Sequence, residues 1–383
     1  MTPPASPLVR LVFLDWVRVL AFALLVAYHV GMYYVSWPWH VKSTHLVPAL
    51  EPFMRLSSPW RMDLLFLVSG VASACLWRKL GAGRRFVRER LARLGWPLLF
   101  GVLVVVPPQA YFEVIDKHAY GGSFIDFMAL YLRGFNGFCN ATAHCLILPT
   151  WNHLWFLPYL ISYTLLLWAW LSWREQALES LAQALDARLR GAALLLAPMV
   201  FLSATRWALA NRWPVSHALV DDFFAHSQHL AFFVFGAVAA HTPSIWPRLH
   251  ALRWPALLLG LASWGALVAA GQLPPTLRAA LFSTQQWCAV VAVLGFAQAH
   301  LNRDSVALRY LTLAVFPVYI LHQTAIILLA RAMLRLHLGP ATAGPLLVGL
   351  TFALCLAVYE TVRRVRWLRP LMGLRRQPTL APA

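Results

Sequence analysis

The feature that most constrains this chain is a series of apolar runs that recurs along almost its whole length. We count ten such runs, at residues 11–35, 62–79, 94–113, 152–172, 191–209, 229–242, 254–271, 281–299, 309–330 and 344–362. Most of them are near the length of about 20 residues that crosses a bilayer as a helix. The sequence therefore predicts an all-α, polytopic membrane bundle of about ten transmembrane helices.

Composition and charge placement support this interpretation. The chain is 60% hydrophobic and only 12% charged, a balance that is not typical of a soluble domain. If the N-terminus is cytoplasmic, the inside segments carry 21 Lys and Arg residues and the outside segments carry 10. This asymmetry predicts that both termini are cytoplasmic. The formal charge of +18 comes largely from Lys and Arg in the inside segments, so it does not indicate a nucleic-acid partner.

The start, MTPPASPLVRLVFLDW, has no cleavable signal pattern, because no small-residue cleavage site follows the apolar run, so we expect residues 11–35 to remain as the first span. We expect residues 1–376 to form one transmembrane domain and residues 377–383 a disordered tail. The segment 114–151 is the longest connection, and loops of that length are usually functional. Within it, Cys139 and Cys145 could form a disulfide if the loop faces an oxidising compartment.

The first span carries three ionisable residues, Asp15, Arg18 and His29. Arg18 and His29 are eleven residues apart, which returns them to nearly the same helix face about 16 Å further along. Asp15 precedes Arg18 by one turn, so the two can pair. Ionisable groups inside a membrane are costly and indicate a functional site by default. The alternative is that Asp15 and Arg18 pair at the membrane edge and only orient the helix, which leaves His29 unexplained.

Further polar residues interrupt the other spans. Arg61 and Asp63 begin the second span, and Ser69-Gly70 forms a small step where helices can approach closely. In the ninth span, Pro317 frees a backbone carbonyl and precedes His322. The histidines that we expect to face the bundle are His29, His40, His153 and His322. A single such histidine is often a hydrogen-bonded core residue, and four together favour proton chemistry near neutral pH.

A basic segment, RKLGAGRRFVRERLAR at 78–93, precedes the third span. Guanidinium groups suit bidentate binding of phosphate. On charge alone, however, a topology anchor that contacts anionic lipid head groups is the simpler interpretation. His217, His226 and His229 flank Asp221-Asp222 and could suggest a metal site, but their spacing is not tight, so we expect a solvated polar loop and no metal.

Taken together, these blocks resemble the acyltransferase-3 family of membrane acyltransferases. The hallmark of that family is Arg-x10-His in the first span, which LDWVRVLAFALLVAYH matches. MDLLFLVSG resembles its Phe-Phe-x-x-Ser-Gly block, RERLARLGWPLL resembles its basic segment before span three, and HLWFL and VYILH follow in order. The resemblance covers about residues 11–376. FLDWVRVLAF, SWPWHVKS, WRMDLLFLVSG and VYETVRRVRWLRPLM are most similar to a branch that succinylates periplasmic glucans.

The resemblance implies an O-acyltransferase of the bacterial inner membrane that moves a succinyl or acetyl group from a cytoplasmic acyl-CoA to a hydroxyl of an extracytoplasmic glucan or other glycan. Acyl-CoA is then a co-substrate, no cofactor is tightly bound, and membrane lipids surround the protein. The expected catalytic residues are His29, Arg18 and Asp15, with Asp15 positioning Arg18. The donor-binding residues are expected to be Arg85, Arg88, Arg90 and Arg93. The acceptor-side or pocket residues are expected to be Trp39, His40, Arg61, Asp63, Ser69, His153, Trp155, Tyr319 and His322.

Two other functions remain open from the residues themselves. The intramembrane ionisable groups could form a proton-coupled path in a transporter of a sugar or lipid-linked carrier, although the two halves show no inverted repeat. They could also form the packed polar core of a structural or sensor protein, in which case His29 would be replaceable without loss of activity. For a dicarboxylic donor, a basic side chain near the acyl group would be needed, and Arg61 or Lys42 could serve.

Overall fold

The chain folds into helices throughout the part that the structure describes. The structure, a computed structural model, describes residues 10–81, 83–140 and 145–375. Within these ranges no strand occurs, and the one isolated bridge joins Cys139 to Cys145, which also form a disulfide. The predicted all-α class is thereby confirmed for the described residues. The predicted tail 377–383 lies outside them.

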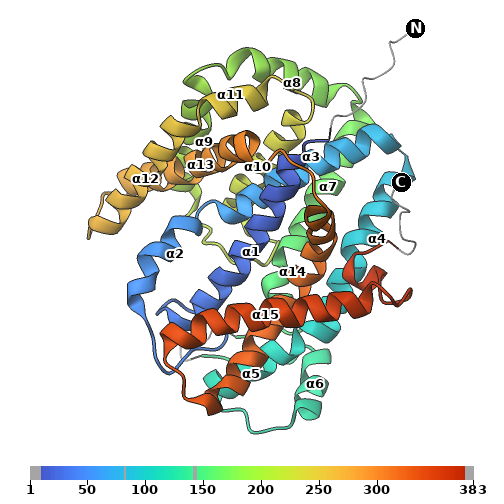
Figure 1. Cartoon of the computed structure of the whole chain (residues 1–383), viewed down its shortest axis with the longest axis vertical. Helices are drawn as coiled ribbons and strands as arrows, with labels where there is room; N and C mark the ends of the chain where they lie inside the picture. The colour runs from blue at the N-terminus through green and yellow to red at the C-terminus, as the bar shows by residue number, and fades with distance from the viewer. Residues whose placement is uncertain (1–9, 82, 141–144, 376–383) are drawn as a thin grey trace. The chain divides into compact units, whose positions relative to one another are not determined.

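The helices differ widely in length, and several are joined by short breaks (Figure 1). The α-helices are α1 (Val12–Tyr34), α2 (Glu51–Ser57), α3 (Arg61–Leu80), α4 (Arg84–Phe100), α5 (Pro107–His118), α6 (Phe124–Leu132), α7 (Phe156–Trp173), α8 (Ala177–Arg188), α9 (Ala193–Leu209), α10 (Phe223–Ala239), α11 (Ile245–Ala251), α12 (Arg253–Ala269), α13 (Pro275–His300), α14 (Val306–Met333) and α15 (Pro340–Val362). The short 3-10 turns are η1 (Pro48–Leu50), η3 (Asn152–Trp155), η4 (Leu334–Leu336) and η5 (Pro370–Met372), and η2 (Gly101–Val105) is a π-helix.

The described residues contain six helical segments long and apolar enough to cross a membrane, or up to nine if each bent helix pair is one span. The bends are 40° between α4 and α5, 112° between α8 and α9, and 59° between α11 and α12. The helix α10, with 17 residues, is apolar but shorter. Each predicted run overlaps one of these helices or pairs, so the chain is a multi-pass membrane protein. The count of ten spans stays a prediction.

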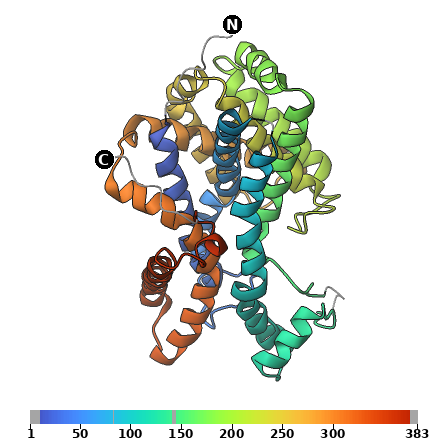
Figure 2. The same ribbon diagram turned by 90° about the vertical axis from the view of Figure 1, so that its right-hand side faces the viewer.

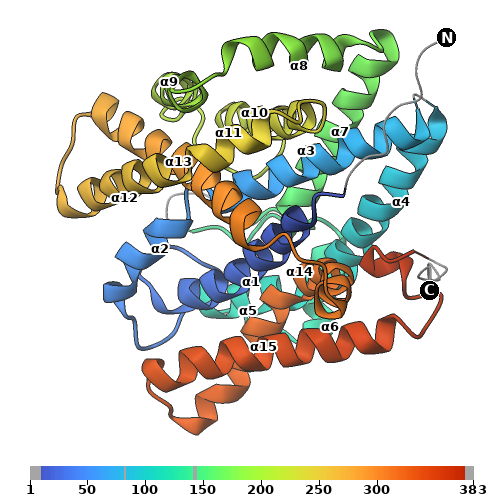
Figure 3. The ribbon, with the colours of Figure 1, turned by 45° about the horizontal axis from the view of Figure 1, so that its top comes forward.

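The chain forms two compact units, and α1, α2, α4, α7 and α14 each contribute residues to both. Unit 1 comprises residues 1–21, 55–88 and 162–312. In it, α12 packs along α13 and α3 packs along α10 (Figure 3). The crossing of α3 and α10 is very close, because a Cβ added at Gly70 would lie 1.9 Å from the carbonyl oxygen of Phe233. The close approach predicted at Ser69-Gly70 is therefore confirmed.

Unit 2 comprises residues 22–54, 89–161 and 313–383. One apolar cluster joins the end of α1 and the following segment to α14 and α15. A second cluster joins α5 to α6, which pack against each other in turquoise in Figure 2. The long connection 114–151 therefore contains the whole of α6, whose first turn carries a capping box between Ser123 and Asp126.

The π-helix η2 sits at the bend between α4 and α5, directly before Pro107 and Pro108. Prolines have no backbone N–H, so the regular helix cannot continue through them and carbonyl groups are left without helical partners. Two side-chain hydroxyls occupy such carbonyls. Tyr131 donates to the oxygen of Val102 at 2.8 Å, and Thr324 donates to the oxygen of Val105 at 2.6 Å. π-Helices of this kind are frequent at functional sites.

Candidate active site

The helix α1 carries all three predicted catalytic residues, but its two ends have different surroundings. Asp15 and Arg18 lie in the part that belongs to unit 1, and His29 lies in the part that belongs to unit 2. We therefore describe the two ends separately. The eleven-residue spacing corresponds to about 16 Å along the helix axis.

The predicted ion pair between Asp15 and Arg18 is wrong. The carboxylate of Asp15 instead accepts hydrogen bonds from Nε and Nη2 of Arg10, at 3.0 and 2.7 Å. Arg10 also reaches Asp304 at 3.2 Å, and its hydrogen bond to Asp15 raises the pKa of the guanidinium. Arg10 precedes the helix, and its Nε and Nη2 both donate to Oδ2 of Asp15. These two charge-assisted hydrogen bonds replace the side-by-side contact expected on the helix surface.

Arg18 binds a backbone group rather than a carboxylate. Its Nη2 donates to the carbonyl oxygen of Thr312 at 3.0 Å, five residues before Pro317 in α14. Its Nε is buried and has no hydrogen-bond partner among the described residues. A buried guanidinium N–H without an acceptor is costly.

His29 meets His322 of α14 inside unit 2. The Nδ1 atom of His29 lies 2.7 Å from Nε2 of His322, and the two rings are inclined by only 8°. His322 is fully buried, and its Nδ1 lies 2.6 Å from the carbonyl oxygen of Tyr319. Trp39 lies beside His29 with its ring centre 6.4 Å away. Trp39, Tyr319 and His322, three of the predicted site residues, thus form one cluster with His29.

His153 is part of the same neighbourhood but both of its ring nitrogens bind protein groups. Its ring is perpendicular to that of His322, with centres 5.0 Å apart. Nε2 donates to the carbonyl oxygen of Ile320 at 3.0 Å, and Nδ1 accepts from Nε2 of Gln109 at 3.3 Å. Tyr319 in turn donates its hydroxyl to the carbonyl oxygen of His153 at 2.9 Å. These contacts assign His153 to holding the cluster together rather than to offering a nitrogen to a substrate.

Gln109 is a central residue that the sequence analysis missed. It lies in α5, two residues after the start of the helix, and is fully buried. Its Nε2 also donates to Thr324 at 2.6 Å, and its Oε1 accepts from Gln323 at 3.0 Å and from Asn152 at 3.3 Å. The available signal was a polar residue directly after Pro107-Pro108 in an apolar run, which indicates a broken helix with polar packing partners.

His40 and Lys117 share one buried carboxylate. His40 Nδ1 lies 2.5 Å from Oε2 of Glu113, and Lys117 donates to Oε1 of the same residue at 2.6 Å. The ring of His40 lies 5.9 Å from that of Trp39, which lies beside His29. His40 is therefore near the histidine pair but held by a charge network of its own.

Lys42 is not available for a carboxylate of the substrate. It donates to the carbonyl oxygens of Met32 at 2.5 Å and Trp37 at 3.1 Å, and to that of Val35. These contacts use all three ammonium hydrogens and cap the end of α1. Burial lowers the pKa of Lys42. The suggestion that Lys42 recognises a dicarboxylic donor is therefore wrong.

Unit 1 holds a second buried polar chain that spans four helices. His229 of α10 donates to Oδ1 of Asp63 in α3 at 2.6 Å, and Gln286 of α13 donates to Oδ2 at 2.7 Å. Arg206 of α9 donates to Gln286 at 3.0 Å and stacks over the ring of Phe282 at 3.9 Å. Arg61 and Asp63 are both buried.

The expectation of a solvated loop around His229 is consequently wrong. The helix α10 begins at Phe223, six residues before the predicted start of the run, so His226 and His229 lie inside the helix. His226 contacts the hydroxyl of Tyr163 at 2.9 Å, and the ring of His229 stacks on Phe66 at 4.7 Å. Among the described residues, no group of three or more His, Cys, Asp or Glu side chains could hold a metal ion.

The remaining predicted residues are distributed over α3, α4 and η3. Arg85, Arg88 and Arg93 are exposed and Arg90 is half-buried, all on α4, with Arg85 and Arg88 in unit 1 and the other two in unit 2. Ser69 is half-buried, and its carbonyl accepts from Ser73 at 2.7 Å. The ring of Trp155 packs edge-on against Tyr159 at 5.4 Å.

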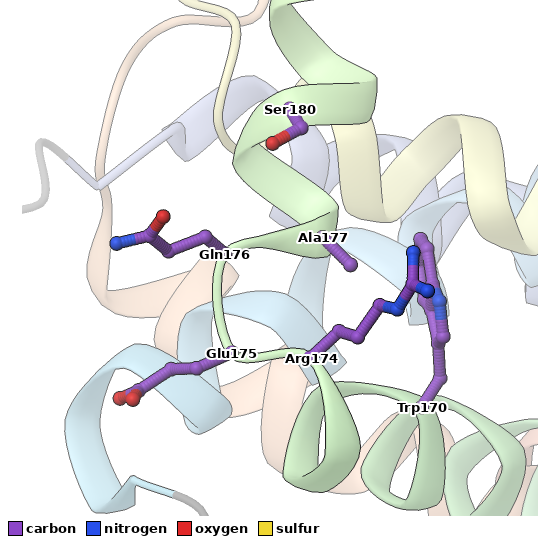
Figure 4. A pocket seen from close by; sticks show the side chains of 6 residues that line it. All are labelled: Trp170, Arg174, Glu175, Gln176, Ala177 and Ser180. Atoms are coloured by element: carbon purple, nitrogen blue, oxygen red, sulfur yellow. The ribbon is translucent and has the colours of Figure 1, made fainter.

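A surface pocket of about 560 Å³ opens where α7 meets α8 in unit 1 (Figure 4). Arg174 and Glu175 contribute charged side chains, and Trp170 forms an apolar wall. None of the predicted site residues lines it. The pocket has an exposed, mixed lining, which does not resemble the buried polar surroundings of His29.

Comparison with known proteins gives one consistent result. A family model described as an acyltransferase domain, of type 3, matches residues 11–360. Glucans biosynthesis protein C of Shigella dysenteriae serotype 1 (strain Sd197) is 26% identical, over 98% of this chain and 99% of its own length. The protein of the same name from Escherichia coli (strain K12) is 25% identical over the same shares. No solved structure matches the chain.

Proposed function

The chain belongs to the type 3 acyltransferase family, and we propose that it is an O-acyltransferase that uses His29 as its reacting base or acyl carrier. The observation that carries the proposal is the contact between His29 and His322, at 2.7 Å inside an apolar bundle. Two imidazoles that share a hydrogen bond can take up and hold a proton near neutral pH. Acyl transfer to a hydroxyl requires that step.

The proposed reaction transfers an acyl group from a thioester to an alcohol. In the direct route, the acceptor O–H bond breaks as the proton moves to His29, the oxygen forms a bond to the acyl carbon, and the C–S bond breaks. The departing thiolate then takes the proton from His29, so the histidine is regenerated. In the covalent route, His29 first attacks the thioester carbon, the C–S bond breaks and the thiolate departs. The acceptor oxygen then bonds to the acyl carbon as the bond to His29 breaks, and the hydroxyl proton ends on the thiolate.

We propose that Arg18 contacts the donor. Its Nε is buried without a partner among the described residues, so an acyl carbonyl or amide oxygen of the donor can accept from it. The arginines of α4, Arg85, Arg88, Arg90 and Arg93, are proposed to hold the phosphates of a cytoplasmic acyl-CoA. The exposure of Arg85, Arg88 and Arg93 fits contact with a soluble donor.

We propose ten spans with both termini in the cytoplasm of a bacterium and the protein in its inner membrane. The lysine and arginine asymmetry supports this orientation. The disulfide between Cys139 and Cys145 supports it as well, because the connection 114–151 then faces the oxidising side. His29 would lie toward that side, where an extracytoplasmic acceptor arrives.

The proposed acceptor is a glucan, by similarity to relatives named for glucan biosynthesis. The proposed acyl group is succinyl or acetyl. A strain that lacks the gene should lose one acyl modification from its periplasmic glucans, and mass spectrometry of the glucans identifies the group from the mass that disappears. Glucans with unchanged masses would contradict this acceptor.

Substitution of the two α1 residues tests the mechanism. His29→Ala and Arg18→Ala should each abolish acylation while the protein still accumulates in the membrane fraction. His45→Ala is the matched control, because His45 is exposed and lies outside the histidine cluster. Wild-type acylation by His29→Ala would refute the proposed function. A labelled acyl group trapped on His29 would select the covalent route, and ternary-complex kinetics would select direct transfer.

A further inference from the structure

We propose that His322 is a positioning residue that fixes the tautomer of His29, so that Nε2 of His29 is the reacting atom. This inference rests on the proposed function and deepens it. The hydrogen bonds from Tyr319 through His322 to His29 determine which ring nitrogen carries each proton.

The starting point is the carbonyl oxygen of Tyr319. It lies 2.6 Å from Nδ1 of His322, and a carbonyl oxygen can only accept a hydrogen bond. Nδ1 of His322 must therefore carry a hydrogen. His322 is fully buried in an apolar helix, where a charged imidazolium is costly. In the neutral ring, Nε2 is then left with a lone pair.

The lone pair on Nε2 of His322 in turn determines the tautomer of His29. Its Nδ1 lies 2.7 Å from Nε2 of His322, so one of these two atoms must donate. Since Nε2 of His322 holds a lone pair, Nδ1 of His29 is the donor. A neutral imidazole carries only one N–H, so Nε2 of His29 holds the basic lone pair. The rings are nearly coplanar, at 8°, with centres 5.0 Å apart, which is the geometry of an in-line N–H to N bond.

The surroundings prevent His322 from turning. The ring of His153 stands perpendicular against it at 5.0 Å, and both nitrogens of His153 bind other protein groups. Tyr319 lies one turn earlier on α14, and its hydroxyl is bound to the backbone of His153. The donor and acceptor directions of His322 are thereby fixed by α14 and η3 together.

This arrangement assigns His322 the role that an orienting acceptor plays for the catalytic histidine of other acyltransfer sites. When Nε2 of His29 takes the hydroxyl proton, His29 becomes an imidazolium. Its Nδ1–H then donates a charge-assisted hydrogen bond to His322, which stabilises the charge. In the covalent route, the same tautomer presents Nε2 as the nucleophile. His322 itself contacts no substrate in either route.

The test compares two amide substitutions at position 322. The carbonyl of a glutamine reaches about as far as Nε2 of histidine, so His322→Gln can still accept from His29. An asparagine is shorter and reaches only the Nδ1 position, so His322→Asn can still donate to Tyr319 but not accept from His29. The assay measures transfer from labelled succinyl-CoA and acetyl-CoA to purified glucan by membranes that contain each variant.

We expect His322→Asn to lower kcat by at least 10-fold, and by up to about 10⁴-fold if the wrong tautomer dominates, with little change in KM. His322→Gln should recover most of kcat. The acid limb of the kcat profile should move to lower pH in His322→Asn, because the imidazolium of His29 has lost its acceptor. A purely structural role would not produce that shift.

Equal kcat values for the two variants, or an unchanged pH profile in His322→Asn, would overturn the inference. These outcomes differ from failure of the proposed function, which would appear as activity in His29→Ala. The control is His45→Gln, which changes an exposed histidine of the same unit and should leave kcat and its pH profile unchanged.

Discussion

The crossing of α3 and α10 allows a prediction whose size can be worked from the structure. A Cβ at Gly70 would lie 1.9 Å from the carbonyl oxygen of Phe233, and a Cβ at Gly236 would lie 1.9 Å from that of Leu67. Both obstacles are backbone atoms, so no side-chain rotation relieves them. Gly70→Ala should therefore force the two helices apart by at least 1 Å, the difference between 1.9 Å and a tolerable contact of 3.0 Å.

That separation also reaches the buried polar chain of unit 1. Asp63 lies on α3 and His229 on α10, and their hydrogen bond is 2.6 Å long. Moved apart by 1 Å or more, the pair exceeds the range of a hydrogen bond. Overpacking costs about 1–3 kcal/mol and a hydrogen bond to a charged group about 1.5–3 kcal/mol. Together these predict a loss of roughly 3–6 kcal/mol in the free energy of unfolding.

Thermal unfolding in detergent measures the effect, with loss of the monodisperse chromatographic peak as the readout. Gly70→Ala should lower the apparent Tm by several degrees. Gly265→Ala is the matched control, because Gly265 is also helical and an added Cβ there meets nothing within 4 Å. It should be neutral or slightly stabilising, since alanine favours helix. An apparent Tm for Gly70→Ala equal to that of the control would refute the reasoning.

Three further predictions concern individual polar groups. Asp63→Asn replaces an acceptor of two hydrogen bonds by a group that can accept only one, and should lower the free energy of unfolding by about 1.5–3 kcal/mol, measured in the same assay. Burial, with a smaller contribution from His229, lowers the pKa of His217 to about 4, so stability should fall as the pH drops from 6.5 to 4, and less steeply in His217→Gln. Denatured, unreduced protein should expose three maleimide-reactive thiols, and five after reduction. Cys139→Ser should expose four thiols both with and without reduction, because Cys145 is then free in either case.

The helices could be predicted from the sequence because membrane insertion imposes a length and a hydropathy that each segment must satisfy by itself. The breaks were harder to locate. The run at 94–113 reads as one span, yet the structure bends it by 40° at the π-helix before Pro107. Similarly, the predicted start at His229 missed the first six residues of α10, because charged Asp221 and Asp222 obscure the beginning of that helix.

The partners of the polar residues could not be predicted, because they are set by packing between distant segments. The sequence identified His29 and His322 as candidates, but nothing in it places the two in contact across 293 positions. Local spacing suggested the wrong partner for Asp15, because Arg18 lies one helical turn away and the spacing alone cannot show a competing residue outside the helix. Arg10, just outside the helix, could approach the carboxylate with two N–H groups at once.

Buried polar residues in this chain are of two kinds, which cannot be told apart in the sequence. In one kind every polar hydrogen or nitrogen has a partner in the protein, and in the other kind at least one does not. Lys42 gives all three of its hydrogens to carbonyls, and His153 uses both ring nitrogens, so their burial is offset within the protein. Arg18 is buried as well, yet its Nε has no partner among the described residues. Such a group loses its hydration without compensation from the described residues, which is why we propose that the acyl donor accepts a hydrogen bond from it. Substitutions of Lys42 or His153 should therefore act mainly through folding, whereas Arg18→Ala should remove transfer and leave stability nearly intact.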